Sequence, residues 1–98
     1  MKSIMQNKDG RCYLCQKLYD NYNPVVTEEH HCISGPNRNL SERYGLKVWL
    51  CIYHHREGKQ AVHSNIDMKK ELCQDAQRAF EAHWPELSFR EIFGKNYL

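Results

Sequence analysis

The sequence predicts a small α+β fold in a single domain, residues 1-98, and three observations support this prediction. Four of the five cysteines and five of the six histidines lie between residues 12 and 63. Two short apolar runs, near residues 25–31 and 47–51, have the length and bounding turn signals of strands. Residues 64–98 carry apolar side chains at spacings of three and four, which is typical of helices. A chain of this length buries only a thin core, so we expect bound metal to stabilise the first half.

The composition indicates which cellular setting and partners to expect. No run approaches the ~18 apolar residues of a membrane span, and the polar start MKSIMQNKDG lacks the apolar stretch of a signal peptide. We therefore expect a cytoplasmic protein with no membrane partner. In a reducing cytosol, cysteines bind metal more often than they form disulfides, and five is an odd number. The net charge of +2 permits a nucleic-acid partner without establishing one.

The second half of the chain predicts two helices. Ser64 is the expected cap of the first, with Asp67 three positions on, and Pro85 ends it. Its apolar face is expected to comprise Ile66, Leu72, Cys73, Ala76, Ala79, Phe80 and Trp84. A second, short helix is predicted from Ser88 to Gly94. These apolar faces either pack on the first half or form a homodimer.

Two pairs of metal-binding residues have matching spacing. Cys12 and Cys15 form a C-x2-C pair, and Cys51 with His54 forms C-x2-H, so together they supply the four ligands of a structural Zn²⁺ site. One alternative is that the cysteines are buried small hydrophobes beside an unrelated histidine. Another is a different division of the ligands.

The remaining histidines are more than a closed zinc site needs. His30 and His31 are adjacent, so on a strand they point to opposite faces and reach one site only at a strand end or irregular turn. His55 follows the last zinc ligand, which would hold it in place. Glu28 and Glu29 either orient the histidine pair or are ordinary exposed acids. In the loop PNRNLSERYGLK, three cations either contact DNA phosphates or belong to a solvated surface: Arg38, Arg43 and Lys47.

The order of these motifs resembles a known family. CYLC, then EEHHCISG, then WLCIYHH and a later AVH, is similar to the HNH endonucleases of the ββα-metal (His-Me finger) fold in their zinc-stapled form. The variety it most resembles is the small nucleases of phages and prophages, one of which is associated with phage recombination. The resemblance covers residues 12-63, while 64-98 form a helical C-terminal extension outside it.

The resemblance implies a metal-dependent endonuclease that hydrolyses DNA phosphodiester bonds. It implies that His30 and His55 bind the catalytic divalent metal (Mg²⁺, Mn²⁺, Ni²⁺ or Zn²⁺), that His63 is a further ligand or a phosphate contact, and that His31 is the catalytic base. It also implies DNA as partner, together with phage packaging or recombination proteins. The family usually has an Asn before the second strand that braces the loop carrying the catalytic His. The segment SERYGLKVW has none, which leaves Asn37 or Asn39 to substitute.

Two other functions remain open at this point. One is a non-catalytic, zinc-finger-like module that binds DNA or protein, for which the absent Asn speaks. The other is a redox or metal sensor that uses the cysteines as a switch. A second, weaker metal ion at the histidines distinguishes the nuclease from the binding module, and stable zinc retention in mild peroxide would count against the sensor.

Overall fold

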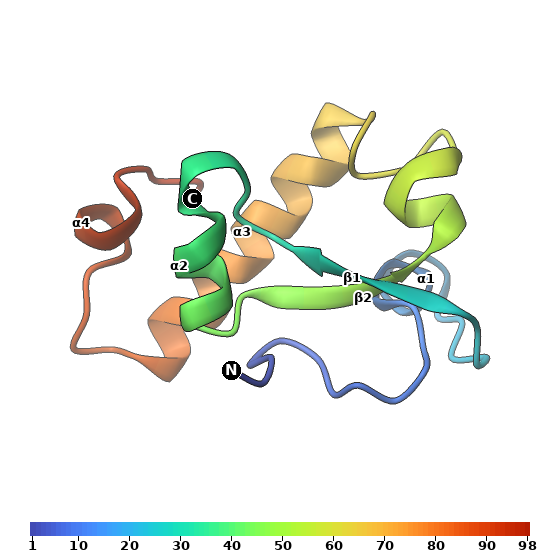
Figure 1. Cartoon of the computed structure of the whole chain (residues 1–98), viewed down its shortest axis with the longest axis horizontal. Coiled ribbons are helices and arrows are strands. Elements are labelled where there is room, and N and C mark those ends of the chain that lie inside the picture. Colours follow the sequence, from blue (N-terminus) through green and yellow to red (C-terminus); the bar gives the residue numbers. More distant parts are fainter.

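A computed structural model describes all residues from 1 to 98 and shows helices around a two-stranded sheet (Figure 1). The predicted α+β class is confirmed. The elements in chain order are α1 (Tyr13–Tyr19), β1 (Thr27–His31), a 3₁₀ turn η1 (Gly35–Asn37), α2 (Arg38–Arg43), β2 (Lys47–Cys51), a π-helical turn η2 (Tyr53–Glu57), α3 (Ile66–His83) and α4 (Phe89–Phe93). None of these helices has the length and apolar character needed to cross a lipid bilayer.

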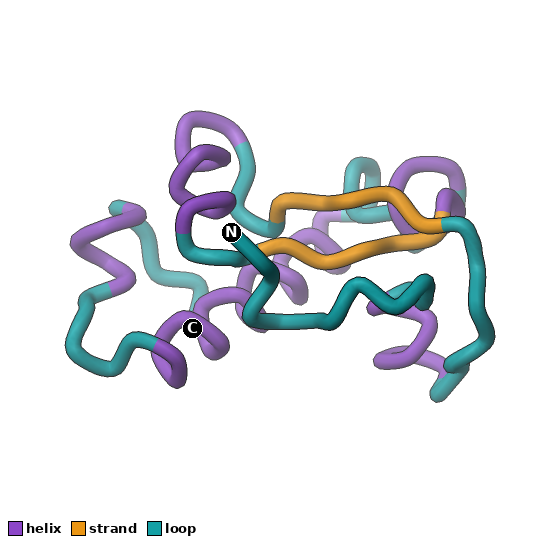
Figure 2. Tube along the Cα trace, turned by 60° about the horizontal axis from the view of Figure 1, so that its bottom comes forward, coloured by secondary structure: helices purple, strands orange, loops and turns teal.

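The sheet consists of β1 and β2 in antiparallel pairing, with Thr27 opposite Cys51 and His31 opposite Lys47. Both strands lie where the sequence predicts them. Their connection was expected to be a long loop, but it contains η1 and α2. The N-terminal segment runs along the free edge of β2 (Figure 2), where the Trp49 amide donates to the Gln6 side chain at 2.8 Å. This segment satisfies backbone groups that an exposed edge would leave open.

The long helix α3 differs from its prediction at its start. The Asn65 side chain, not Ser64, caps it, accepting hydrogen bonds from the amides of Asp67 (3.0 Å) and Met68 (3.1 Å). Ile66 is 81% exposed, so its expected place on the apolar face is wrong: as the first residue of the helix it lies beyond the core. The prediction for α4 is confirmed, since the Ser88 side chain caps it and Gly94 ends it in the left-handed conformation at φ 71°.

One core joins the two halves of the chain. Its buried members include Leu14, Leu46, Val48 and Leu50 from the first half and Leu72, Cys73, Ala76, Phe80, Phe89 and Phe93 from the second. Tyr44, just after α2, contacts the rings of Phe80 and Trp84 at centroid distances of 5.3 and 5.1 Å. The apolar face of α3 is therefore covered within the chain, and the homodimer stays a prediction.

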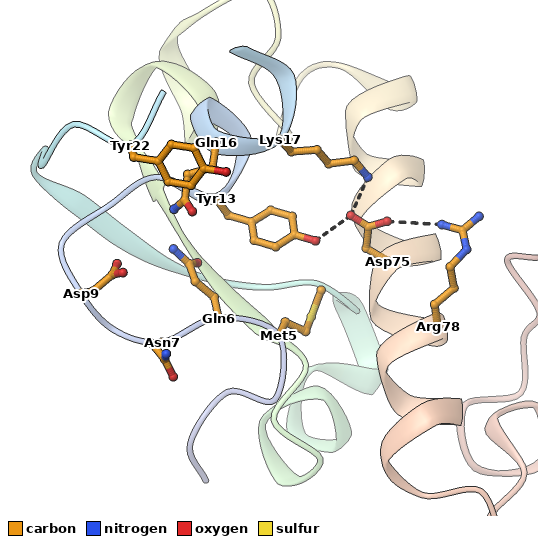
Figure 3. A pocket seen from close by; sticks show the side chains of 10 residues that line it. All are labelled: Met5, Gln6, Asn7, Asp9, Tyr13, Gln16, Lys17, Tyr22, Asp75 and Arg78. Carbon is orange, nitrogen blue, oxygen red and sulfur yellow. Dashed lines mark hydrogen bonds and ion pairs between the residues drawn. The ribbon is translucent and has the colours of Figure 1, made fainter. Parts of the chain in front are cut away.

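Asp75 on α3 fixes α1 in place. Its carboxylate accepts hydrogen bonds from the Tyr13 hydroxyl at 2.7 Å and the Lys17 ammonium at 2.6 Å, and it pairs with Arg78 at 3.3 Å (Figure 3). Burial and the neighbouring Asp75 raise the pKa of Tyr13 well above its ordinary range. These contacts set the position of the helix that carries two of the predicted zinc ligands.

Candidate metal centres

The four predicted zinc ligands converge from three elements. Cys12 is the cap of α1 and Cys15 lies in its first turn, so the predicted turn of the C-x2-C pair is the start of a helix. The Cys12 sulfur accepts a hydrogen bond from the Cys15 amide at 3.4 Å, which holds the pair together. Cys51 ends β2 and His54 lies in η2, one turn further on. The sheet thus brings the second pair against the first.

Their distances fit one tetrahedral metal ion. The His54 Nδ1 atom lies 3.7, 3.4 and 3.4 Å from the sulfurs of Cys12, Cys15 and Cys51, and the last two sulfurs are 3.9 Å apart. Zinc bonds of about 2.3 Å to sulfur and about 2.0–2.1 Å to nitrogen place tetrahedral donors about 3.6 Å (S to N) and about 3.8 Å (S to S) apart. All five cysteines are free, and the sulfurs are too far apart for a disulfide. The cluster has the geometry to hold a structural metal such as zinc.

Without a cation these thiols hold their protons. Burial, together with the neighbouring thiols, raises the pKa of Cys15 to about 12, and burial raises that of Cys51 as well. Burial also lowers the pKa of His54, which keeps its imidazole neutral. Zinc binding therefore has to release protons, and acid opposes it.

A second cluster consists of three imidazoles. His30 comes from β1, His55 from η2 and His63 from the turn before α3. Their rings contact one another at centroid distances of 4.6 to 5.3 Å, and one nitrogen of each lies within 4.8 Å of the others. The Nε2 atoms of His55 and His63 are 2.9 Å apart, a distance at which two such nitrogens share a proton or a metal ion.

Neighbouring contacts hold this cluster together. The amide of Val62 donates to the His54 carbonyl at 2.8 Å, which lays the segment carrying His63 beside η2. The Glu28 carboxylate accepts from His55 Nδ1 at 2.8 Å, and Arg56 and His55 together lower the pKa of Glu28 to about 2. Glu28 therefore orients His55, not the histidine pair, and leaves His55 Nε2 free to bind a metal.

The three imidazoles are in the right state to bind a cation. Burial, and then the charges of the neighbouring histidines, lower the pKa of His30 to about 3. Burial and His55 lower the pKa of His63 as well. A neutral imidazole offers a lone pair, and nitrogen donors suit Zn²⁺, Ni²⁺ and similar divalent ions.

His31 borders the same pocket as the cluster. It is the last residue of β1, so the strand end lets both neighbours face one site, as the sequence analysis required. A pocket of about 280 Å³ is lined by Glu29, His30, His31, Ser34, Arg38, His55 and His63. The His31 ring is 2.8 Å from the Glu42 carboxylate through Nε2, a contact that would fix its tautomer and leave Nδ1 as the acceptor.

The three candidate DNA contacts have different surroundings. Arg38 is exposed and lines the histidine pocket, and Arg43 is exposed at the end of α2. Lys47 is only 8% exposed and lies 3.0 Å from Glu42 and 3.6 Å from Glu29. Its ammonium is neutralised by these carboxylates, so we omit Lys47 from the DNA contacts proposed below.

The loop that carries His31 is braced by a residue the sequence analysis did not single out. The buried Ser41 hydroxyl donates to the Leu46 carbonyl at 2.6 Å and accepts from the Ile33 amide at 3.2 Å, which joins the two ends of the connection between the strands. Asn37 instead donates to the Phe93 carbonyl, and Asn39 is exposed. A serine in a polar loop carries no signal that would have revealed this role.

Comparison with protein-family models, with curated proteins and with solved structures found no match for this chain.

Proposed function

We propose that this chain is a metal-dependent endonuclease of the HNH type that hydrolyses DNA phosphodiester bonds. The observation that carries the proposal is the convergence of His30, His55 and His63 within 4.8 Å in a pocket that His31 and Arg38 also line. These donors are separate from the Cys12, Cys15, Cys51 and His54 cluster. One site would be structural and the other catalytic, with β1, β2 and η2 forming the ββα-metal core.

In the proposed reaction, His31 takes a proton from water, the water oxygen bonds to phosphorus, and the bond from phosphorus to the 3′ oxygen breaks. A divalent ion held by His30, His55 and His63 would supply positive charge to the phosphate and the departing oxygen. Glu42 holds the His31 ring in position, and Arg38 contacts a phosphate oxygen from the pocket rim. The products carry 5′ phosphate and 3′ hydroxyl ends.

Plasmid nicking tests this function. Purified protein is incubated with supercoiled plasmid and added Mg²⁺, Mn²⁺, Ni²⁺ or Zn²⁺, beside His31→Ala and a control, His83→Ala, which removes an exposed histidine far along α3. We expect metal-dependent nicking by the parent and the control and none by His31→Ala, with tight zinc in all three. Full activity in His31→Ala would refute the assignment of the base.

A non-catalytic zinc-containing module that binds DNA or protein is the second candidate. It is favoured by the contact between His31 Nε2 and Glu42, which occupies one of the two nitrogens of the proposed base. That function predicts one tight zinc per chain and no cleavage with any metal. Phage packaging or recombination proteins, which the family resemblance suggests as partners, would suit either function.

A further inference from the structure

Three lysines on the C-terminal extension have no carboxylate partner. Lys69 and Lys70 lie in the first turns of α3, and Lys95 follows α4. All three are exposed, and none of the ion pairs in the structure includes them. They line one pocket of about 690 Å³ together with Ile66, Gln74 and Tyr97.

This lysine pocket borders the histidine pocket. Ser34 lines both, and the start of α3 and η2 lie on the same side of β1 in Figure 1. After burial and the neighbouring histidines, the charge of Lys69 also lowers the pKa of His30, which shows that the ammonium is close to the cluster. Arg38, the exposed cation of the histidine pocket, has no ion pair either. Unpaired positive charge therefore continues from one pocket into the other.

We propose that Lys69, Lys70 and Lys95 form a surface that binds the phosphate backbone of DNA beside the histidine pocket. The inference rests on the proposed function, and it places DNA binding on the helical extension and not on β2. A DNA strand presents one negative charge per about 3.4 Å of its axis, so a strand passing the histidines meets several of these cations at once. An acidic peptide would complement the lysines equally, but it would have no reason to continue to Arg38 and the histidines.

The contacts expected here carry no sequence information. Lysine binds phosphate as a point charge, and no base-reading helix face accompanies these side chains. We therefore expect binding that is insensitive to sequence and strongly dependent on salt.

The test compares two triple variants of the zinc-loaded protein. The first is Lys69→Gln, Lys70→Gln and Lys95→Gln. The second, matched in charge, is Lys2→Gln, Lys8→Gln and Arg90→Gln, which removes exposed cations without ion pairs from the N-terminal segment and α4. Affinity for a fluorescent 30-base-pair duplex of arbitrary sequence is measured by anisotropy from 50 to 300 mM NaCl, without added divalent metal, so that cleavage plays no part.

We expect the first variant to lose affinity by about 10- to 500-fold at 0.1 M salt and to reduce the salt slope by about 3, one for each contact. The second should stay within about threefold of the parent. Equal losses in the two variants, an unchanged first variant, or binding of a polyglutamate peptide but not of DNA would each overturn the proposal. If binding falls as expected but the parent nicks no plasmid, the DNA surface stands and the nuclease proposal fails; nicking with unchanged binding has the opposite meaning.

Discussion

The brace at Ser41 allows a stability prediction with a magnitude. Ser41→Ala removes a hydroxyl that is fully buried and makes two hydrogen bonds, at 2.6 and 3.2 Å. The Leu46 carbonyl keeps a second donor, the Cys32 amide at 3.0 Å, whereas the buried Ile33 amide is left with no partner. An unsatisfied buried donor costs about 1–3 kcal/mol and a lost hydrogen bond about 0.5–1.5 kcal/mol. The free energy of unfolding should therefore fall by about 2–4 kcal/mol.

Urea unfolding of the zinc-loaded protein, followed by far-UV circular dichroism, measures this loss. With a slope of about 1–3 kcal/mol per molar urea, the midpoint should drop by at least about 0.7 M. Ser64→Ala is the control, because its exposed hydroxyl makes only a 3.5 Å contact and should change stability by less than about 0.5 kcal/mol. Equal midpoints for the two variants would refute the brace. Because Ile33 lies two residues after His31, nicking by folded Ser41→Ala should also slow.

Three further predictions concern the helix cap, alkaline pH and the zinc cluster. Asn65→Ala should cost about 1 kcal/mol in urea unfolding, as expected for a lost N-cap, and a negligible cost would contradict the cap. The raised pKa of Tyr13 means that above pH about 10 the unfolded chain loses its proton first, so stability should fall as pH rises, and less steeply in Asp75→Asn; equal slopes from pH 9 to 11 would contradict this. Cys51→Ser should abolish tight zinc binding and lower the melting temperature, both measured on the purified protein; retained zinc would contradict the ligand set.

Much of the fold follows from short-range signals. The C-x2-C and C-x2-H spacings bring donors together because each spans one helical turn, as α1 and η2 do. Serine and glycine mark the ends of α4 because their caps are local. The start of α3 was misplaced by one residue, since Ser64 and Asn65 are both good caps and only the backbone conformation of Asn65 decides between them.

The parts that the sequence did not predict depend on contacts between distant segments. Lys47 belongs to a polar loop in the sequence, yet α2 brings Glu42 to it and buries its ammonium. Glu28 meets His55 because the strand pairing places Thr27 beside Cys51, 24 residues further along the chain, just before η2. The lysine pocket combines two ends of the extension that no periodicity connects.

The count of metal ions per chain tests the central claim of two separate sites most directly. Native mass spectrometry of the protein with excess Zn²⁺ or Ni²⁺ is compared with that of the variant His55→Ala with His63→Ala. Two ions on the parent and one on the variant, with that one resisting dialysis, is the predicted result. One ion on both proteins, or two on both, would show that the histidines hold no metal and would contradict the account.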